Sequence, residues 1–129
     1  MISNSGKDKL CPFCQSLEVV AEHNSVFAIK DNYPVTKGHH LIIPFSHTEN
    51  YFSMTDKERK DATALLKALK SKLEEGDPTI TGFNIGMNSG KTAGQTVMHS
   101  HIHLIPRRKG DTPNPRGGVR GVIPNKMDY

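Results

Sequence analysis

The stretch His99-Ser100-His101-Ile102-His103-Leu104-Ile105 places three of the chain's seven histidines in strict alternation. Successive side chains of a β-strand point to opposite faces, so the alternation predicts three imidazoles on one face of a strand. Imidazole changes its protonation state near neutral pH, ligates metals and, when neutral, acts as a nucleophile. The stretch therefore predicts metal, proton-transfer or nucleophilic chemistry on one rigid face.

Further strands are expected upstream of this stretch. Residues 25–31 and 39–44 are short apolar runs separated by the turn signal Asp31-Asn32-Tyr33-Pro34, which predicts an antiparallel pair. Residues 80–87 predict another strand. Between them, residues 55–75 predict a long helix that packs on the sheet, because Thr55 and Glu58 can form a capping box ahead of a leucine stripe. That stripe consists of Leu65, Leu66, Leu69 and Leu73, and Gly76 ends the helix.

Length and composition predict one domain spanning residues 1–129. Residues 1–10 are expected to be flexible, and residues 112–129 to form a basic, irregular arm rich in Pro and Gly. No apolar segment is long enough for a membrane span or a signal peptide, so we expect a cytoplasmic protein with no membrane partner. The net charge is +4, but the basic residues are not interleaved with aromatic residues as in a nucleic-acid-binding module. Solubility or the binding of a phosphorylated small molecule therefore explains the charge better than the binding of nucleic acid.

The two cysteines lie close together as Cys11-Pro12-Phe13-Cys14. In a reducing compartment this spacing favours half of a zinc site, with a redox pair as the alternative and a structural disulfide less expected. A zinc site with two cysteines needs two more ligands, and histidine is the usual choice. We expect His47, just after the second strand, and His99 to supply them, which leaves His101 and His103 free.

The polar loop Asn88-Ser89-Gly90-Lys91-Thr92-Ala93-Gly94-Gln95-Thr96 runs directly into the histidine stretch. Such a loop can present N–H groups to an anion, or it can be a plain connection. Next to the loop, His101 could attack phosphorus if a main-chain carbonyl or a carboxylate accepted its Nδ1–H and left Nε2 unprotonated. One alternative remains open here: a zinc hydrolase that uses the three histidines as ligands.

The segment from Ala93 to Asp111 resembles the signature of the histidine triad (HIT) family, His-x-His-x-His followed by two apolar residues. It is particularly similar to the fragile histidine triad branch of dinucleoside polyphosphate hydrolases. The likeness continues upstream through Phe27–Asp31, Gly38-His39 and Ile43–His47. The resemblance implies an α+β fold, with an antiparallel β-sheet and one long helix, and a homodimer in which the sheet continues across both subunits.

The resemblance also implies a purine nucleotide as substrate and a covalent nucleotidyl-histidine at His101. The alternative is a nucleotide-binding regulatory module with little turnover. It gives His103 a phosphate contact, His39 a supporting role, and the Cys/His set a structural Zn²⁺. The nucleotide- and phosphate-binding positions that it implies, together with the loop above, are Phe13, Ile29, Asp31, Asn88, Gly94, Gln95 and Thr96. This chain departs from the family pattern at Ser100, where an apolar residue is usual, at Asp31, where the fragile branch has Asn, at Lys91 and Thr92 in the loop, and in the arm after Asp111.

Overall fold

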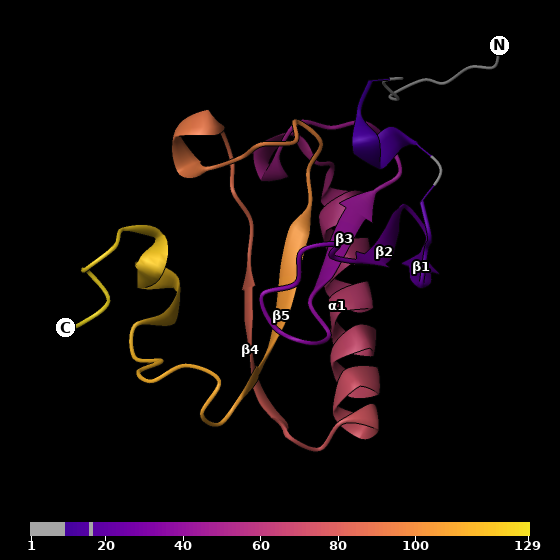
Figure 1. Ribbon diagram of the computed structural model, residues 1–129. Coiled ribbons are helices and arrows are strands. Elements are labelled where there is room, and N and C mark those ends of the chain that lie inside the picture. The colour runs from indigo at the N-terminus through magenta and orange to yellow at the C-terminus, as the bar shows by residue number, and fades with distance from the viewer. Residues whose placement is uncertain (1–9, 16) are drawn as a thin grey trace, which may run out of the picture.

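The computed structural model describes residues 10–15 and 17–129 and contains a five-stranded antiparallel sheet with one long helix on one face (Figure 1). The expected α+β fold is confirmed. The strands lie in the order β1-β2-β3-β5-β4. Their bounds are β1 Ala21–His23, β2 Val26–Lys30, β3 His40–Pro44, β4 Ile80–Gly86 and β5 Ile102–Arg108, and the helix α1 spans Asp56–Gly76.

The helix α1 begins at the expected capping box. Thr55 Oγ1 accepts from the Glu58 N–H at 3.0 Å, and the Glu58 carboxylate accepts from the Thr55 N–H at 2.8 Å. Leu65 and Leu69 are buried, while Leu66 and Leu73 are half-buried against the same core. The helix therefore covers the sheet face formed by Val26, Ala28, Ile42, Ile102 and Leu104.

The opposite face of the sheet carries a second apolar cluster. It consists of Phe27, Ile29, Leu41 and Ile43, and it is covered by Phe13 and Leu17 from the segment that contains the cysteines. His103 pairs with Leu41 in the register of β5 with β3, so the histidine side chain lies on this face. The N-terminal segment and the histidine chemistry thus share one face, and α1 occupies the other.

The histidine strand begins later than the alternation predicts. We expected a strand from His99, but β5 starts at Ile102, so only His103 lies inside it. The Ser100 N–H donates to the Thr48 carbonyl at 2.7 Å, which draws this segment toward the loop after β3. Ser100, at the position where the family usually has an apolar residue, is fully buried, and its hydroxyl lies 3.0 Å from Met54 Sδ.

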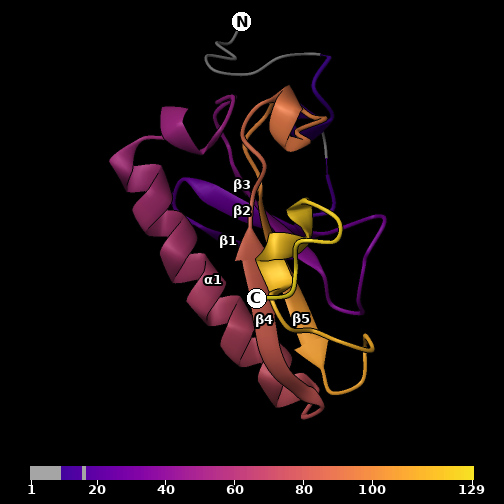
Figure 2. The ribbon, with the colours of Figure 1, turned by 90° about the vertical axis from the view of Figure 1, so that its left-hand side faces the viewer.

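Two further elements differ from the sequence-based expectation. The short strand β1 was not predicted; it pairs with β2 through a tight turn in which Asn24 takes φ 51°, a left-handed conformation that Asn tolerates. The arm after Asp111 contains the 3₁₀ turn η4, Gly118–Val122, which was not predicted and lies beside β4 (Figure 2). The flexibility expected for residues 1–10 falls, except for Leu10, outside the described residues.

The arm closes on itself through several contacts. The guanidinium groups of Arg116 and Arg120 lie 5.1 and 4.9 Å from the centre of the Tyr129 ring. Gly117 takes φ 88° and packs directly against the Met127 carbonyl, where a Cβ would clash. Within the two described ranges, no helix is both long and apolar enough to cross a membrane.

Candidate active site and metal centre

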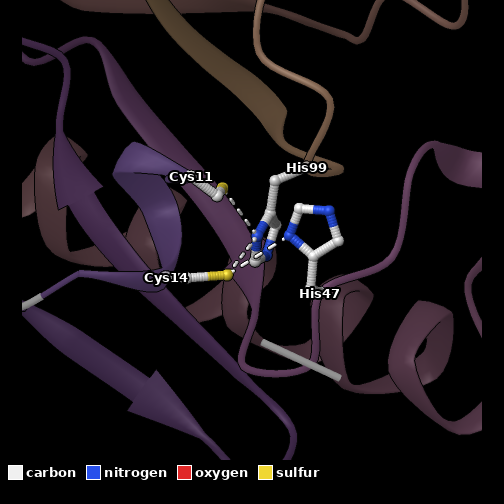
Figure 3. A group of neighbouring side chains, drawn as sticks. All are labelled: Cys11, Cys14, His47 and His99. Carbon is white, nitrogen blue, oxygen red and sulfur yellow. Dashed lines mark hydrogen bonds between the residues drawn. The ribbon is translucent and has the colours of Figure 1, made fainter. Parts of the chain in front are cut away.

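Four side chains from three distant segments form a Cys/His cluster (Figure 3). They are the expected set, Cys11, Cys14, His47 and His99. His99 Nδ1 lies 3.4 Å from each sulfur, and His47 Nδ1 lies 3.2 Å from Cys14 Sγ. The ligand atoms all lie within 4.8 Å of one another.

The chemistry of this cluster fits a tetrahedral metal. Two thiols and two imidazoles are the donor set of structural zinc, whose ligands lie roughly 2.0–2.3 Å from the ion and therefore within a few Å of one another. His99 is fully buried, and its Nε2–H donates to the Pro44 carbonyl at 2.8 Å. That bond turns the unprotonated Nδ1 toward the sulfurs, as a metal-ligating histidine requires. Burial also lowers the pKa of His99, which favours the neutral ring.

His101 has the ring orientation of a nucleophile. Its Nδ1–H donates to the His99 carbonyl at 2.8 Å, so the neutral ring carries its lone pair on Nε2. Phe13, from the cysteine turn, packs edge-on against this ring with centroids 5.0 Å apart. His99 thus contributes its ring to the Cys/His cluster and its carbonyl to the neighbouring His101.

His39 and His103 form a hydrogen-bonded pair beside Asp31. The Val35 N–H donates to His39 Nδ1 at 3.2 Å, so the proton of neutral His39 lies on Nε2 and is donated to His103 Nδ1 at 2.9 Å. This leaves His103 with its own proton on Nε2. Asp31 lies 3.3 Å from His39 Nε2 and 4.0 Å from His103 Nδ1.

This hydrogen-bond order argues against metal chemistry at Asp31, His39 and His103, although their ligand atoms are close enough together for an ion. A metal at His39 Nε2 would displace the proton to Nδ1, where it would meet the Val35 N–H. Burial, with the charges of His101 and His39 adding to it, lowers the pKa of His103 to about 4. Burial likewise lowers the pKa of His39. Both rings are therefore neutral near pH 7.

A cavity of about 490 Å³ opens next to this pair. His39, His103 and Asn88 line one side, and Val119 and Val122 of the arm line the other. The volume falls within the range of small-molecule sites. The sequence did not predict that the arm lines this cavity, because the arm reaches β4 only by turning back after Asp111.

The remaining predicted positions lie around these groups in different ways. Gln95 is buried and holds the loop together, since its amide donates to the Glu49 and Val97 carbonyls and accepts from the Gly90 N–H. Gly94 takes φ 97° and its N–H bonds to the Lys91 carbonyl, so the loop uses both residues internally. Thr96 is exposed. Ile29 is buried in the core beside Phe13 rather than lining the 490 Å³ cavity.

Comparison with known proteins agrees with this geometry. The family model of the HIT domain matches residues 15–110 of this sequence. Protein hit of Bacillus subtilis is 39% identical over 109 residues, which cover 78% of this chain and 74% of that protein. An uncharacterized HIT-like protein of Methanocaldococcus jannaschii is 37% identical over 109 residues, covering 79% and 82%.

Among solved structures, a zinc-bound histidine triad family protein from Mycobacterium smegmatis is similar. It has a TM-score of 0.73 and 32% identity, and the match covers 81% of this chain and 80% of that one. An antiparallel sheet, one helix and three alternating histidines, of which His103 borders a cavity, define a class of small α+β histidine proteins. The family match over residues 15–110 assigns the chain within that class, and the protein belongs to the HIT family.

Proposed function

We propose that this protein cleaves a nucleoside 5′-monophosphate, in the first place AMP, from a leaving group through a covalent adduct on His101. The observation that supports the proposal most directly is the bond from His101 Nδ1 to the His99 carbonyl, which leaves Nε2 as the attacking atom. Dinucleoside polyphosphates, nucleoside phosphoramidates and acyl adenylates all present such a phosphorus atom.

The proposed reaction has two steps. His101 Nε2 forms a bond to the α-phosphorus, and the bond from that phosphorus to the leaving group breaks. Water or another acceptor then attacks the phosphorus and releases His101 with its lone pair restored. The Nε2–H of neutral His103 would donate to a phosphoryl oxygen, and Asn88 borders the same cavity.

The nucleoside is proposed to bind near Phe13 and Ile29, with Asp31 at the ribose hydroxyls and Thr96 near the phosphoryl or leaving-group oxygens. We place the protein closest to the fragile histidine triad branch, because Gly94-Gln95-Thr96-Val97 precedes its triad. We propose Zn²⁺ as the structural ion of the Cys/His cluster, where Cys11, Cys14, His47 and His99 would hold it. A cytoplasmic location is proposed with it, since that compartment keeps thiols reduced.

A homodimer with a continuous sheet is part of the same proposal. The two outer strands of the sheet are β1 and β4. β4 is the longer, and Ile85 on it is 52% exposed. A long outer strand with an apolar exposed side chain is suited to pairing with a second copy.

Trapping the adduct tests the mechanism. The protein is mixed with diadenosine polyphosphate, adenosine phosphoramidate or an acyl adenylate, quenched in alkali and analysed by mass spectrometry with peptide mapping. We expect one AMP moiety on the peptide that contains His101, and no adduct in His101→Ala. His23→Ala, which changes an exposed histidine on β1, should react like the parent. An adduct that persists in His101→Ala, or none with any donor, would refute the proposal.

A further inference from the structure

A second cavity lies on the helix-covered side of the sheet. Its volume is about 720 Å³, and it lies between the C-terminal half of α1 and the end of the sheet where β2 and β5 finish and β3 and β4 begin. Val20, Leu69, Leu73 and Ile80 form apolar parts of its wall. A concave, largely apolar space of this size with a few polar groups has the character of a small-molecule site.

Three lysines from different elements border this cavity. They are Lys30 at the end of β2, Lys37 in the connection to β3, and Lys72 on α1. In the described part of the chain, none of the three lies within ion-pair distance of a carboxylate. The carboxylate in the wall, Asp77, is engaged by Arg108 at 2.9 Å. Three positive charges, in addition to the Arg108–Asp77 pair, therefore border one concavity, which concentrates anions there.

His40 supplies a buried polar group to the same wall. It is 6% exposed, and its Nδ1–H donates to the Gly38 carbonyl at 2.6 Å. Its Nε2 has no hydrogen-bond partner among the described residues. Since no fully buried side-chain nitrogen or oxygen of those residues lacks a partner, this nitrogen reaches the open space of the cavity. This nitrogen is therefore available to a ligand that enters the cavity.

His40 and His39 are neighbours in sequence whose side chains lie on opposite sides of the sheet. His39 borders the 490 Å³ cavity, and His40 borders the 720 Å³ cavity. The second cavity is therefore separated by the sheet from the candidate active site, and none of the proposed catalytic residues borders it.

We propose that the 720 Å³ cavity binds a small phosphomonoester that carries an apolar or aromatic body. The three lysines match a phosphate dianion better than a single carboxylate, because each ammonium group can neutralise part of its charge. Nε2 of His40 accepts from the P–OH group when the phosphomonoester is a monoanion. The apolar wall accommodates the organic body. This site is independent of the chemistry proposed for His101.

Phenyl phosphate is a suitable probe of the full chain, followed by ¹⁵N-resolved NMR. We expect saturable shifts of the amides around Gly38, Lys72 and Asp77. Inorganic phosphate and phenol should each bind at least tenfold more weakly, since each offers one half of the recognised chemistry. Raising the salt concentration should weaken phenyl phosphate binding, because exposed lysines contribute to it.

Two variants test the residues. Lys30→Gln combined with Lys72→Gln should raise the Kd of phenyl phosphate at least tenfold, whereas Lys60→Gln combined with Lys67→Gln, on α1 outside the cavity, should change it less than twofold. His40→Leu, which keeps an apolar side chain in place of the ring, should raise it about fivefold; its amide spectrum and melting curve report whether it folds. Shifts confined to residues around His103, equal losses in both lysine pairs, or equal binding of inorganic phosphate would overturn the proposal.

Discussion

The proton positions of the histidine rings follow from single hydrogen bonds to the main chain. The Val35 N–H fixes His39, the His99 carbonyl fixes His101, and the Pro44 carbonyl fixes His99. His103 is fixed in turn by His39. As a result, each ring has one defined donor nitrogen and one defined acceptor nitrogen, and the lone pair on His101 Nε2 is determined before any ligand binds.

The pKa of His103 predicts a pH dependence of stability. The pKa is lowered from 6.5 to about 4 in the folded chain, so between these values the unfolded chain binds a proton that the folded chain does not. The free energy of unfolding should therefore fall as the pH is lowered from about 6.5 to 4, by roughly 3 kcal/mol from this residue. Urea denaturation across this pH range measures it.

His103→Asn isolates the contribution of this one ring. The asparagine Oδ1 can still accept from His39 Nε2–H, so the fold should be kept while the pH dependence becomes shallower. His39, whose pKa is also lowered, should supply part of what remains. A pH dependence as steep as that of the parent would contradict the assignment to His103.

At this scale, the sequence predicts those features of the site that depend on residue type. It does not predict those that depend on the position of main-chain groups. The two cysteines and the alternating histidines limited the ligands to a few candidates, and Cys11, Cys14, His47 and His99 do come together. The partners that set ring polarity are main-chain groups, and any residue type could have supplied them. The cavity surface formed by the arm has no residue-type signal either.

At the scale of elements, α1 was predictable because its signals are local. A capping box acts over three residues and the leucine stripe over about two turns, so both are visible in sequence. The start of β5 was not, because it depends on the bond from Ser100 N–H to Thr48, about fifty positions earlier. β1 has three residues, too few for a periodic pattern.

The capping box of α1 gives a stability prediction. Thr55→Ala removes the acceptor for the Glu58 N–H and should lower the free energy of unfolding by about 1 kcal/mol. Thr63→Ala is a matched change on the exposed face of the same helix and should have an effect within about 0.5 kcal/mol of zero. Urea denaturation of the two variants side by side measures both, and equal losses would show that the cap is not important.

The arm gives a second prediction at this scale. Gly117→Ala should break the contact with Met127, because the residue has φ 88° and an added Cβ would strike the carbonyl. Gly121→Ala meets only the flexible Met127 side chain and should be tolerated. We expect trypsin to cut Gly117→Ala faster at Arg116 and Arg120, with little change in melting temperature. Unchanged cleavage would mean that the arm is held by other contacts.

At the scale of the whole molecule, the Cys/His cluster joins segments that are far apart in sequence. It ties the turn at residues 11–14 to the loop after β3 and to the segment before β5. Phe13 and Leu17, which flank Cys14, cover the second apolar cluster. A metal at this position would therefore hold Phe13 and Leu17 in place against that face of the sheet.

Metal removal tests this organisation. The parent should contain one zinc per chain by elemental analysis, and Cys11→Ser should lose it together with roughly 3 kcal/mol of stability, the value for a ligand at about 100 times its Kd. Some adduct formation should persist in the variant, because His101 keeps its bond to the His99 carbonyl. Full zinc content in Cys11→Ser, or no change in stability on chelation, would contradict the proposed centre.

The main-chain hydrogen bonds of the histidine rings also bear on how such a protein can diverge. Side-chain substitution cannot delete a carbonyl or, proline at position 35 aside, an N–H. Mutations that alter Val119, Val122 or Asn88 can therefore remodel what the cavity accommodates without reversing the polarity of His101. What the cavity accommodates and the polarity of the His101 ring are thus inherited through different parts of the chain. Under the proposed function, a lineage can take up new substrates while the attacking nitrogen stays unchanged.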